Sequence, residues 1–126
     1  MLTQLQMADE TKRRSERVIP VVNDEEAVVI RIGQQQGLGK MLDLSEGGTL
    51  VYLFLFDHDV AFEVGSPCTL TLNYRNKLFD VPSKICRVTG RLVGFEFVDP
   101  EEAAQRLLSE KLIRMEVEWT RISLKT

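Results

Sequence analysis

Two short clusters of polar residues could together hold a phosphorylated ligand. The first is Arg13-Arg14-Ser15-Glu16-Arg17, in which two arginines stand four positions apart and Lys12 directly precedes them. A guanidinium group can form paired hydrogen bonds to a phosphate or to a guanine edge, and it can stack on a base. Two arginines at this spacing can therefore contact one ligand from more than one side.

The second cluster is Asp43-Leu44-Ser45-Glu46-Gly47-Gly48, which has the pattern Asp-x-Ser-x-x-Gly. An ionised carboxylate only accepts hydrogen bonds, so Asp43 suits the N1–H and N2–H donors of guanine. Ser45 can donate or accept, and Gly47 and Gly48 allow a positive φ and a close approach of ligand to backbone N–H groups. The two clusters together suit a small anionic ligand that also carries hydrogen-bond donors.

The charge distribution of the 126-residue chain points in the same direction. Its formal net charge is −3, from 16 Lys and Arg against 19 Asp and Glu, which argues against a general DNA or RNA binder. Four of the cations nevertheless fall within six positions: Lys12, Arg13, Arg14 and Arg17. The net figure hides a local basic cluster suited to one small anion.

Catalytic and metal-binding patterns are missing from the sequence. His58 is the single histidine and has no motif around it, and no serine lies in a Gly-x-Ser-x-Gly elbow. Cys68 and Cys86 lack the spacing of a metal site, and we expect two buried or half-buried thiols in a reducing compartment. We therefore expect no enzyme, no metal and no cofactor.

The middle of the chain must position these clusters, and it is rich in β-strand patterns. The run 49–56 is apolar without clean alternation, which is typical of a strand covered on both faces, whereas Cys68, Leu70, Leu72 and Tyr74 alternate onto one face. Short strands joined by turns, without intervening helices, predict an antiparallel barrel or sandwich. The expected strands are 27–32, 38–42, 49–56, 68–74, 78–81, 84–88 and 92–98.

A helix is expected after the last strand. In Asp99-Pro100-Glu101-Glu102, Asp99 suits the N-cap and Pro100 the first helical position. Apolar residues then recur at steps of three and four, and the sequence leaves open whether the part from Val117 to Leu124 stays helical or frays and turns extended. This stripe packs on the barrel or forms a subunit contact; its members are Ala104, Leu108, Leu112, Met115, Trp119 and Ile122.

The two clusters, in this order and followed by this β pattern and a helix, resemble the PilZ domain, a bacterial receptor module for cyclic di-GMP. The resemblance implies a six- or seven-stranded antiparallel β-barrel with a C-terminal α-helix. It implies that Arg13 and Arg17 hold phosphates and guanine edges, that Asp43 reads a guanine, and that Ser45 and Gly48 shape the loop. Lys12, Arg14 and Gly47 are additional candidates, and Lys12 favours a stacked pair of ligands over a single one.

The resemblance also suggests a domain layout and a mode of action. We expect a mobile arm at 1–12, the PilZ barrel at 13–100, and a helix and tail at 101–126. The ligand would order the basic arm, and a single-domain receptor would signal through an unidentified protein partner in motility, biofilm or related control. A homodimer through the C-terminal helix is the alternative use of the apolar stripe.

Two other functions compete with this reading. The same fold can serve as a ligand-independent interaction adaptor, and a small RNA-binding barrel ranks last because Phe54, Phe56, Phe95 and Phe97 lie in apolar strands without interleaved basic residues. The longest apolar stretch, 50–56, is far shorter than the roughly 20 residues that a membrane span needs. With no signal-peptide pattern at the N-terminus, we expect a cytoplasmic protein.

Overall fold

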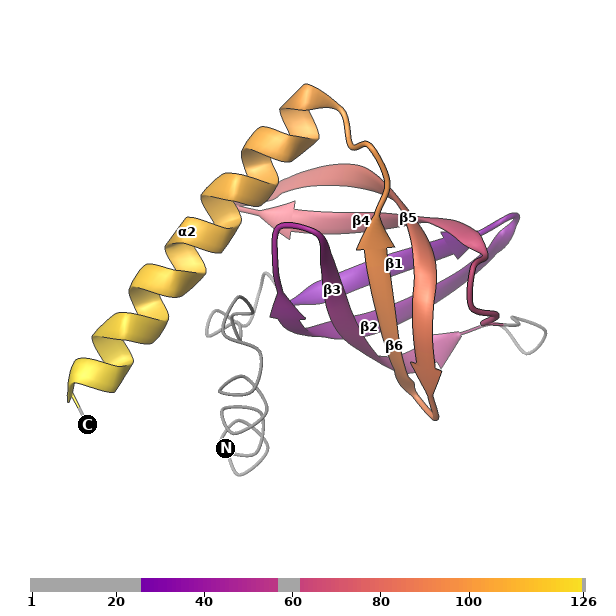
Figure 1. The fold of residues 1–126 in the computed structure, drawn as a ribbon, viewed down its shortest axis with the longest axis horizontal. Coiled ribbons are helices and arrows are strands. Elements are labelled where there is room, and N and C mark those ends of the chain that lie inside the picture. The colour runs from indigo at the N-terminus through magenta and orange to yellow at the C-terminus, as the bar shows by residue number, and fades with distance from the viewer. Residues whose placement is uncertain (1–25, 57–61, 126) are drawn as a thin grey trace.

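The computed structural model describes residues 26–56 and 62–125, in which six strands form a closed barrel. The strand order around the barrel is β1-β2-β3-β6-β5-β4, and every pair is antiparallel (Figure 1). β1 closes the circle by pairing with β4, with Val29 opposite Thr71. The strands are β1 (Ala27–Ile32), β2 (Gln35–Leu44), β3 (Gly48–Phe56), β4 (Pro67–Tyr74), β5 (Lys77–Thr89) and β6 (Leu92–Phe97).

One helix, α2 (Glu102–Lys125), follows β6 and packs across one end of the barrel (Figure 1). Its apolar stripe joins the barrel core through Ala104, Leu108, Leu112 and Met115, so this part of the stripe faces the barrel as one of the two expectations had it. The predicted fold, a mainly β six- or seven-stranded antiparallel barrel with a C-terminal helix, is confirmed.

The barrel interior is filled by side chains that alternate along each strand. β4 shows this most clearly, because Cys68, Leu70, Leu72 and Tyr74 are all buried, as their period of two predicts. The inward apolar residues of the other strands pack against them. Among them are Val28, Ile30, Met41, Leu44, Val51, Leu53, Val81, Ile85, Val93 and Phe95.

The expectation for β3 is wrong in its second half. Residues 48–51 are buried, but Tyr52 and Phe54 are 40% and 44% exposed, and Leu55 is 62% exposed. Here the outer face of the strand carries apolar side chains that no layer of described residues covers. The apolar run therefore belongs to a strand whose inner face is buried and whose outer face is apolar and, in its second half, exposed.

β5 is one strand where the sequence predicts two. It runs through Pro82, which lacks an N–H but whose carbonyl accepts a hydrogen bond from Val98 N at 2.8 Å. A register shift between Ile85 and Arg87 leaves Cys86 as the extra residue of a bulge. Cys86 is exposed at this bulge, contrary to the expectation of a buried or half-buried thiol, whereas Cys68 is buried.

The helix begins later than the sequence suggests. Asp99 has a φ of 40° and is not the N-cap; the first helical hydrogen bond runs from Gln105 N to Glu101 O at 2.8 Å, so the helix begins at Glu102. It continues to Lys125, so the segment 117–124, which the sequence left open, is helical. In the described part of the chain, no helix is both long and apolar enough to cross a membrane.

Candidate functional site

The second polar cluster forms the hairpin between β2 and β3. Asp43 lies one residue before the end of β2, its side chain is buried, and its Oδ1 accepts a hydrogen bond from Leu50 N at 3.1 Å. Its carbonyl oxygen accepts a second bond from Thr49 Oγ1 at 2.6 Å. Asp43 therefore holds the two strands together at the point where the loop leaves the barrel.

The loop itself is closed by Ser45 and Gly48. Ser45 N donates to the carbonyl of Gly48 at 2.9 Å, and Ser45 Oγ approaches the same oxygen at 3.3 Å. Phe97 N donates to the carbonyl of Gly47 at 2.8 Å, which ties the loop to β6. The structure thus brings Asp43, Ser45, Gly47 and Gly48 together in one braced turn.

The two glycines differ in how closely their surroundings approach them, and neither adopts a positive φ. The described glycines with positive φ are Gly33, Gly65 and Gly90, so the expectation for Gly47 and Gly48 is wrong on this point. A Cβ at Gly48 would collide with the carbonyl oxygen of Phe95, because β3 and β6 approach closely there. A Cβ at Gly47 would meet no atom within 4 Å. The close packing of β3 against β6 therefore requires glycine at position 48, whereas Gly47 borders open space.

The first polar cluster cannot be placed relative to this hairpin. Lys12, Arg13, Arg14 and Arg17 lie outside the described residues, as does the expected arm at 1–12. Their roles, and the role of Asp43 toward a base, stay predictions. The nearest described cation on the same strand as Asp43 is Lys40, whose Nζ lies 3.3 Å from Oε2 of the buried Glu26.

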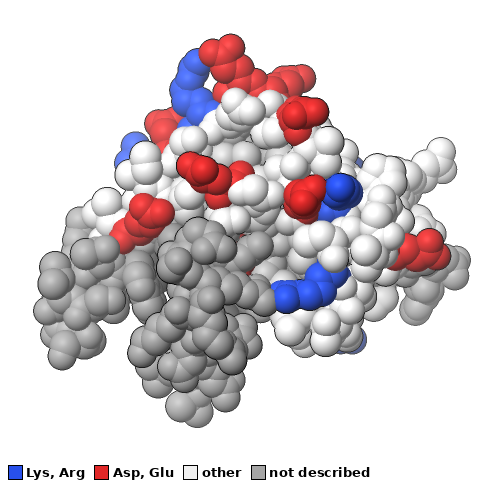
Figure 2. Space-filling view, in the orientation of Figure 1, with Lys and Arg blue, Asp and Glu red and all other residues white. Residues whose placement is uncertain are grey.

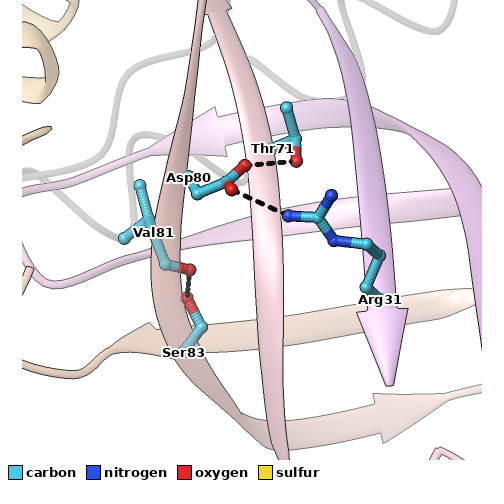
Figure 3. A network of polar contacts seen from close by, with 5 residues as sticks. All are labelled: Arg31, Thr71, Asp80, Val81 and Ser83. Atoms are coloured by element: carbon cyan, nitrogen blue, oxygen red, sulfur yellow. Dashed lines mark hydrogen bonds and ion pairs between the residues drawn. The ribbon is translucent and has the colours of Figure 1, made fainter. Parts of the chain in front are cut away.

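A second polar network lies on a different wall of the barrel and has a structural role. Asp80 on β5 accepts a hydrogen bond from Thr71 Oγ1 at 2.7 Å and pairs with Arg31 at 2.9 Å (Figure 3). The Thr71 hydroxyl, and then the Arg31 guanidinium, lower the pKa of Asp80 below its ordinary value. Ser83 Oγ donates to the carbonyl of Val81 at 3.1 Å in the same strand. These contacts join β1, β4 and β5.

Lys111 is a residue that the sequence analysis missed. It is 1% exposed, and its Nζ donates to the carbonyl of Asn73 at 2.8 Å, which attaches α2 to the end of β4. The signal was present, because position 111 is seven after Ala104 and three after Leu108 and so lies on the buried stripe. A charged residue on that apolar stripe indicates a buried side chain that needs a hydrogen-bond partner on the barrel.

Metal binding receives no support from the described side chains. Within residues 26–56 and 62–125, no three His, Cys, Asp or Glu side chains gather as a metal site would require. Asp57, His58 and Asp59 lie outside these ranges.

Comparison with known families decides the classification. The model of the PilZ domain matches residues 11–114, a range that includes both polar clusters, the barrel and most of the helix. The chain belongs to the PilZ domain family. A comparison with curated protein sequences gives no significant match.

Solved PilZ structures share the fold at low sequence identity. The PilZ domain of YcgR from Escherichia coli, solved with c-di-GMP, aligns with a TM-score of 0.70 at 14% identity, over 87% of this chain and 95% of that one. The PilZ domain of CeSA from a cellulose-synthesizing bacterium gives 0.61 at 16% identity, over 79% and 97%. The Bacillus subtilis inhibitor of motility, MotI/DgrA, gives 0.61 at 15% identity, over 81% of this chain and 50% of that one.

Proposed function

We propose that this PilZ domain is a receptor for cyclic di-GMP. The observation that carries the proposal is the hairpin at Asp43–Gly48, a closed and braced turn that presents the Asp-x-Ser-x-x-Gly pattern on a PilZ barrel. The Arg-x-x-x-Arg pattern at Arg13 and Arg17 precedes it in the chain. The similar YcgR domain was solved with c-di-GMP.

The chemistry of each residue fits this ligand. A carboxylate has about four lone-pair sites, so Asp43 can accept guanine N–H donors while keeping its bond from Leu50 N. The Ser45 hydroxyl and the backbone of the turn would supply further polar contacts. Arg13 and Arg17 supply the charge that two phosphodiesters require, with Lys12 and Arg14 as further cations and Gly47 as the open position of the turn.

The output of such a receptor is a change in the surface offered to another protein. A basic segment rich in like charge gains order when an anion bridges it to the barrel, which converts ligand binding into a new surface. Each role proposed above is a contact that binds the ligand, so we propose a receptor and not an enzyme.

Calorimetric titration with cyclic di-GMP tests the proposal. Arg17→Ala and Asp43→Asn should each weaken binding about ten- to hundredfold, because each removes a charged contact with the ligand. Arg106→Ala is the matched control, since Arg106 is an exposed arginine on α2 and should leave the affinity unchanged. The same titration counts one or two ligands per chain. Equal affinity of the parent and Arg17→Ala would overturn the assignment.

A ligand-independent adaptor is the second candidate, and the outer face of β3 favours it. Tyr52 and Phe54 are exposed apolar side chains of the kind that contact other proteins, and Leu55 at the end of the strand is exposed as well. On α2, Ile113 and Val117 are also exposed, one turn apart, and would serve a homodimer through the helix. Absence of any heat with cyclic di-GMP, together with a dimer mass by light scattering that Val117→Glu abolishes, would favour this candidate.

A further inference from the structure

A hollow of about 410 Å³ lies on the helix side of the Asp43–Gly48 turn. Its walls come from three parts of the chain: Glu46 and Gly47 of the turn, the segment from Phe97 to Pro100, and the flank of α2. The helix contributes Gln105, Leu108, Ser109 and Leu112. A hollow of this size can take a small ligand or a few side chains of a peptide.

The floor of the hollow is apolar and its edges are acidic. Leu108 and Leu112 are buried in the core cluster, and Phe97 packs against that cluster. Glu46 of the turn and Asp99 of the segment before α2 both line the hollow, and neither has an ion-pair partner among the described residues. Among the described residues, no lysine or arginine lines the hollow. Arg106 on α2 lies 3.9 Å from Glu102, and Lys84 on β5 pairs with Glu96 at 3.1 Å.

The wider surface has the same sign of charge. Acidic side chains gather over α2 and the segment that leads into it (Figure 2), and Glu101, Glu102 and Glu110 are among the exposed ones. The hollow extends from Asp99 and Pro100, just before α2, along the helix to Leu112, and the charged side chains among its described lining residues, Glu46 and Asp99, are both acidic. The potential over the hollow therefore favours a cationic occupant.

We propose that this hollow docks a basic and apolar peptide segment of a partner protein. Its Leu- or Phe-type side chains would pack on Leu108 and Leu112, and its Arg or Lys would bond to Glu46 and Asp99. Glu46 and Gly47 belong to the turn that the proposed function assigns to cyclic di-GMP, and Phe97 N bonds to Gly47 O. On that proposed function, a ligand that rigidifies the turn tightens peptide binding about fivefold or more.

The test is a selection of random twelve-residue displayed peptides on the full chain, with and without cyclic di-GMP. The enriched peptides should combine Arg or Lys with large apolar residues. In titrations, the Glu46→Gln/Asp99→Asn double variant should weaken them about tenfold, and asparagine still tolerates the positive φ of residue 99. Ser109→Trp, an exposed position that fills the hollow, should abolish binding, and Glu116→Gln, elsewhere on α2, should change nothing.

Several results would overturn the inference. These are a selection that yields no binder, peptides without basic residues, unchanged affinity for Ser109→Trp when circular dichroism shows it folded, or displacement of the peptides by a synthetic copy of residues 11–18. The proposed function can fail separately from this inference. If peptides bind the hollow but the chain gives no heat with cyclic di-GMP, the docking site stands and the receptor function is excluded.

Discussion

Asp43 Oδ1 accepts a hydrogen bond from Leu50 N at 3.1 Å, across the hairpin whose turn carries the proposed ligand site. The residue expected to read a base is therefore also a structural tie between β2 and β3. Thr49, which donates to the Asp43 carbonyl at 2.6 Å, adds a second tie at the same point. Substitutions of Asp43 will affect both folding and binding, and the two effects can be separated by the choice of side chain.

Asp43→Ala should lower the free energy of unfolding by about 1–3 kcal/mol, because it leaves the buried N–H of Leu50 without its acceptor. Asp43→Asn should lower it less, since the amide oxygen can still accept that bond. Urea denaturation of the three proteins measures both values. Equal stability of Asp43→Ala and the parent would show that the hydrogen bond contributes nothing to the hairpin.

Gly48→Ala should destabilise the barrel by about 1–3 kcal/mol, because the added Cβ meets the carbonyl of Phe95 and must push β3 and β6 apart. Gly47→Ala is its matched control, since the added methyl meets no atom within 4 Å. Gly47→Ala should change the stability by less than about 0.5 kcal/mol. Thermal melts of both variants decide this, and similar losses at the two positions would contradict the packing argument.

The elements whose sequence shows one clear local pattern could be predicted from that pattern. The alternation of Cys68, Leu70, Leu72 and Tyr74 identified a strand and its inner face, and the helical stripe identified the surface of α2 that meets the barrel. The Asp43–Gly48 pattern was correctly placed in a turn between two strands. These predictions held because period and turn chemistry act over a few residues.

Features that depend on distant segments could not be obtained in this way. Gly48 is required by the carbonyl of Phe95, a contact across two strands far apart in the chain. Pro82 stays within β5 because its carbonyl, and not the N–H that it lacks, makes the bond to Val98. The exposure of Cys86 depends on a register shift that appears only once β5 and β6 are paired.

Acidification should remove the stabilisation that Asp80 contributes. The Thr71 hydroxyl, and then Arg31, lower the pKa of Asp80 in the folded state, so the stabilisation is complete above the ordinary value of 3.8 and is lost as the pH falls through the lowered pKa. The pair is partly exposed, so Asp80→Ala should cost under about 1 kcal/mol at neutral pH. The difference in unfolding free energy between the parent and Asp80→Ala should shrink on acidification.

Denaturant titrations at a series of acidic pH values measure this difference. Glu63→Ala is the control, because it removes an exposed carboxylate outside the Thr71–Asp80–Arg31 network. If the difference in unfolding free energy between the parent and Asp80→Ala stays constant down to strongly acidic pH, the Thr71–Asp80–Arg31 network is not its origin.

The two thiols should react at very different rates. Cys86 is exposed at the β5 bulge, whereas Cys68 is buried and burial raises the pKa of its thiol from 9.0 to about 11. A colourimetric disulfide reagent at neutral pH should therefore modify one thiol per folded chain quickly, because only the thiolate attacks it and Cys68 is both covered and protonated. Cys86→Ser should remove the fast phase, and urea should expose the second thiol. Because the folded state keeps the Cys68 proton to a higher pH than the unfolded state does, stability should also fall as the pH rises from 9.0 towards 11. Two thiols that react at the same rate in the folded protein would contradict the burial of Cys68.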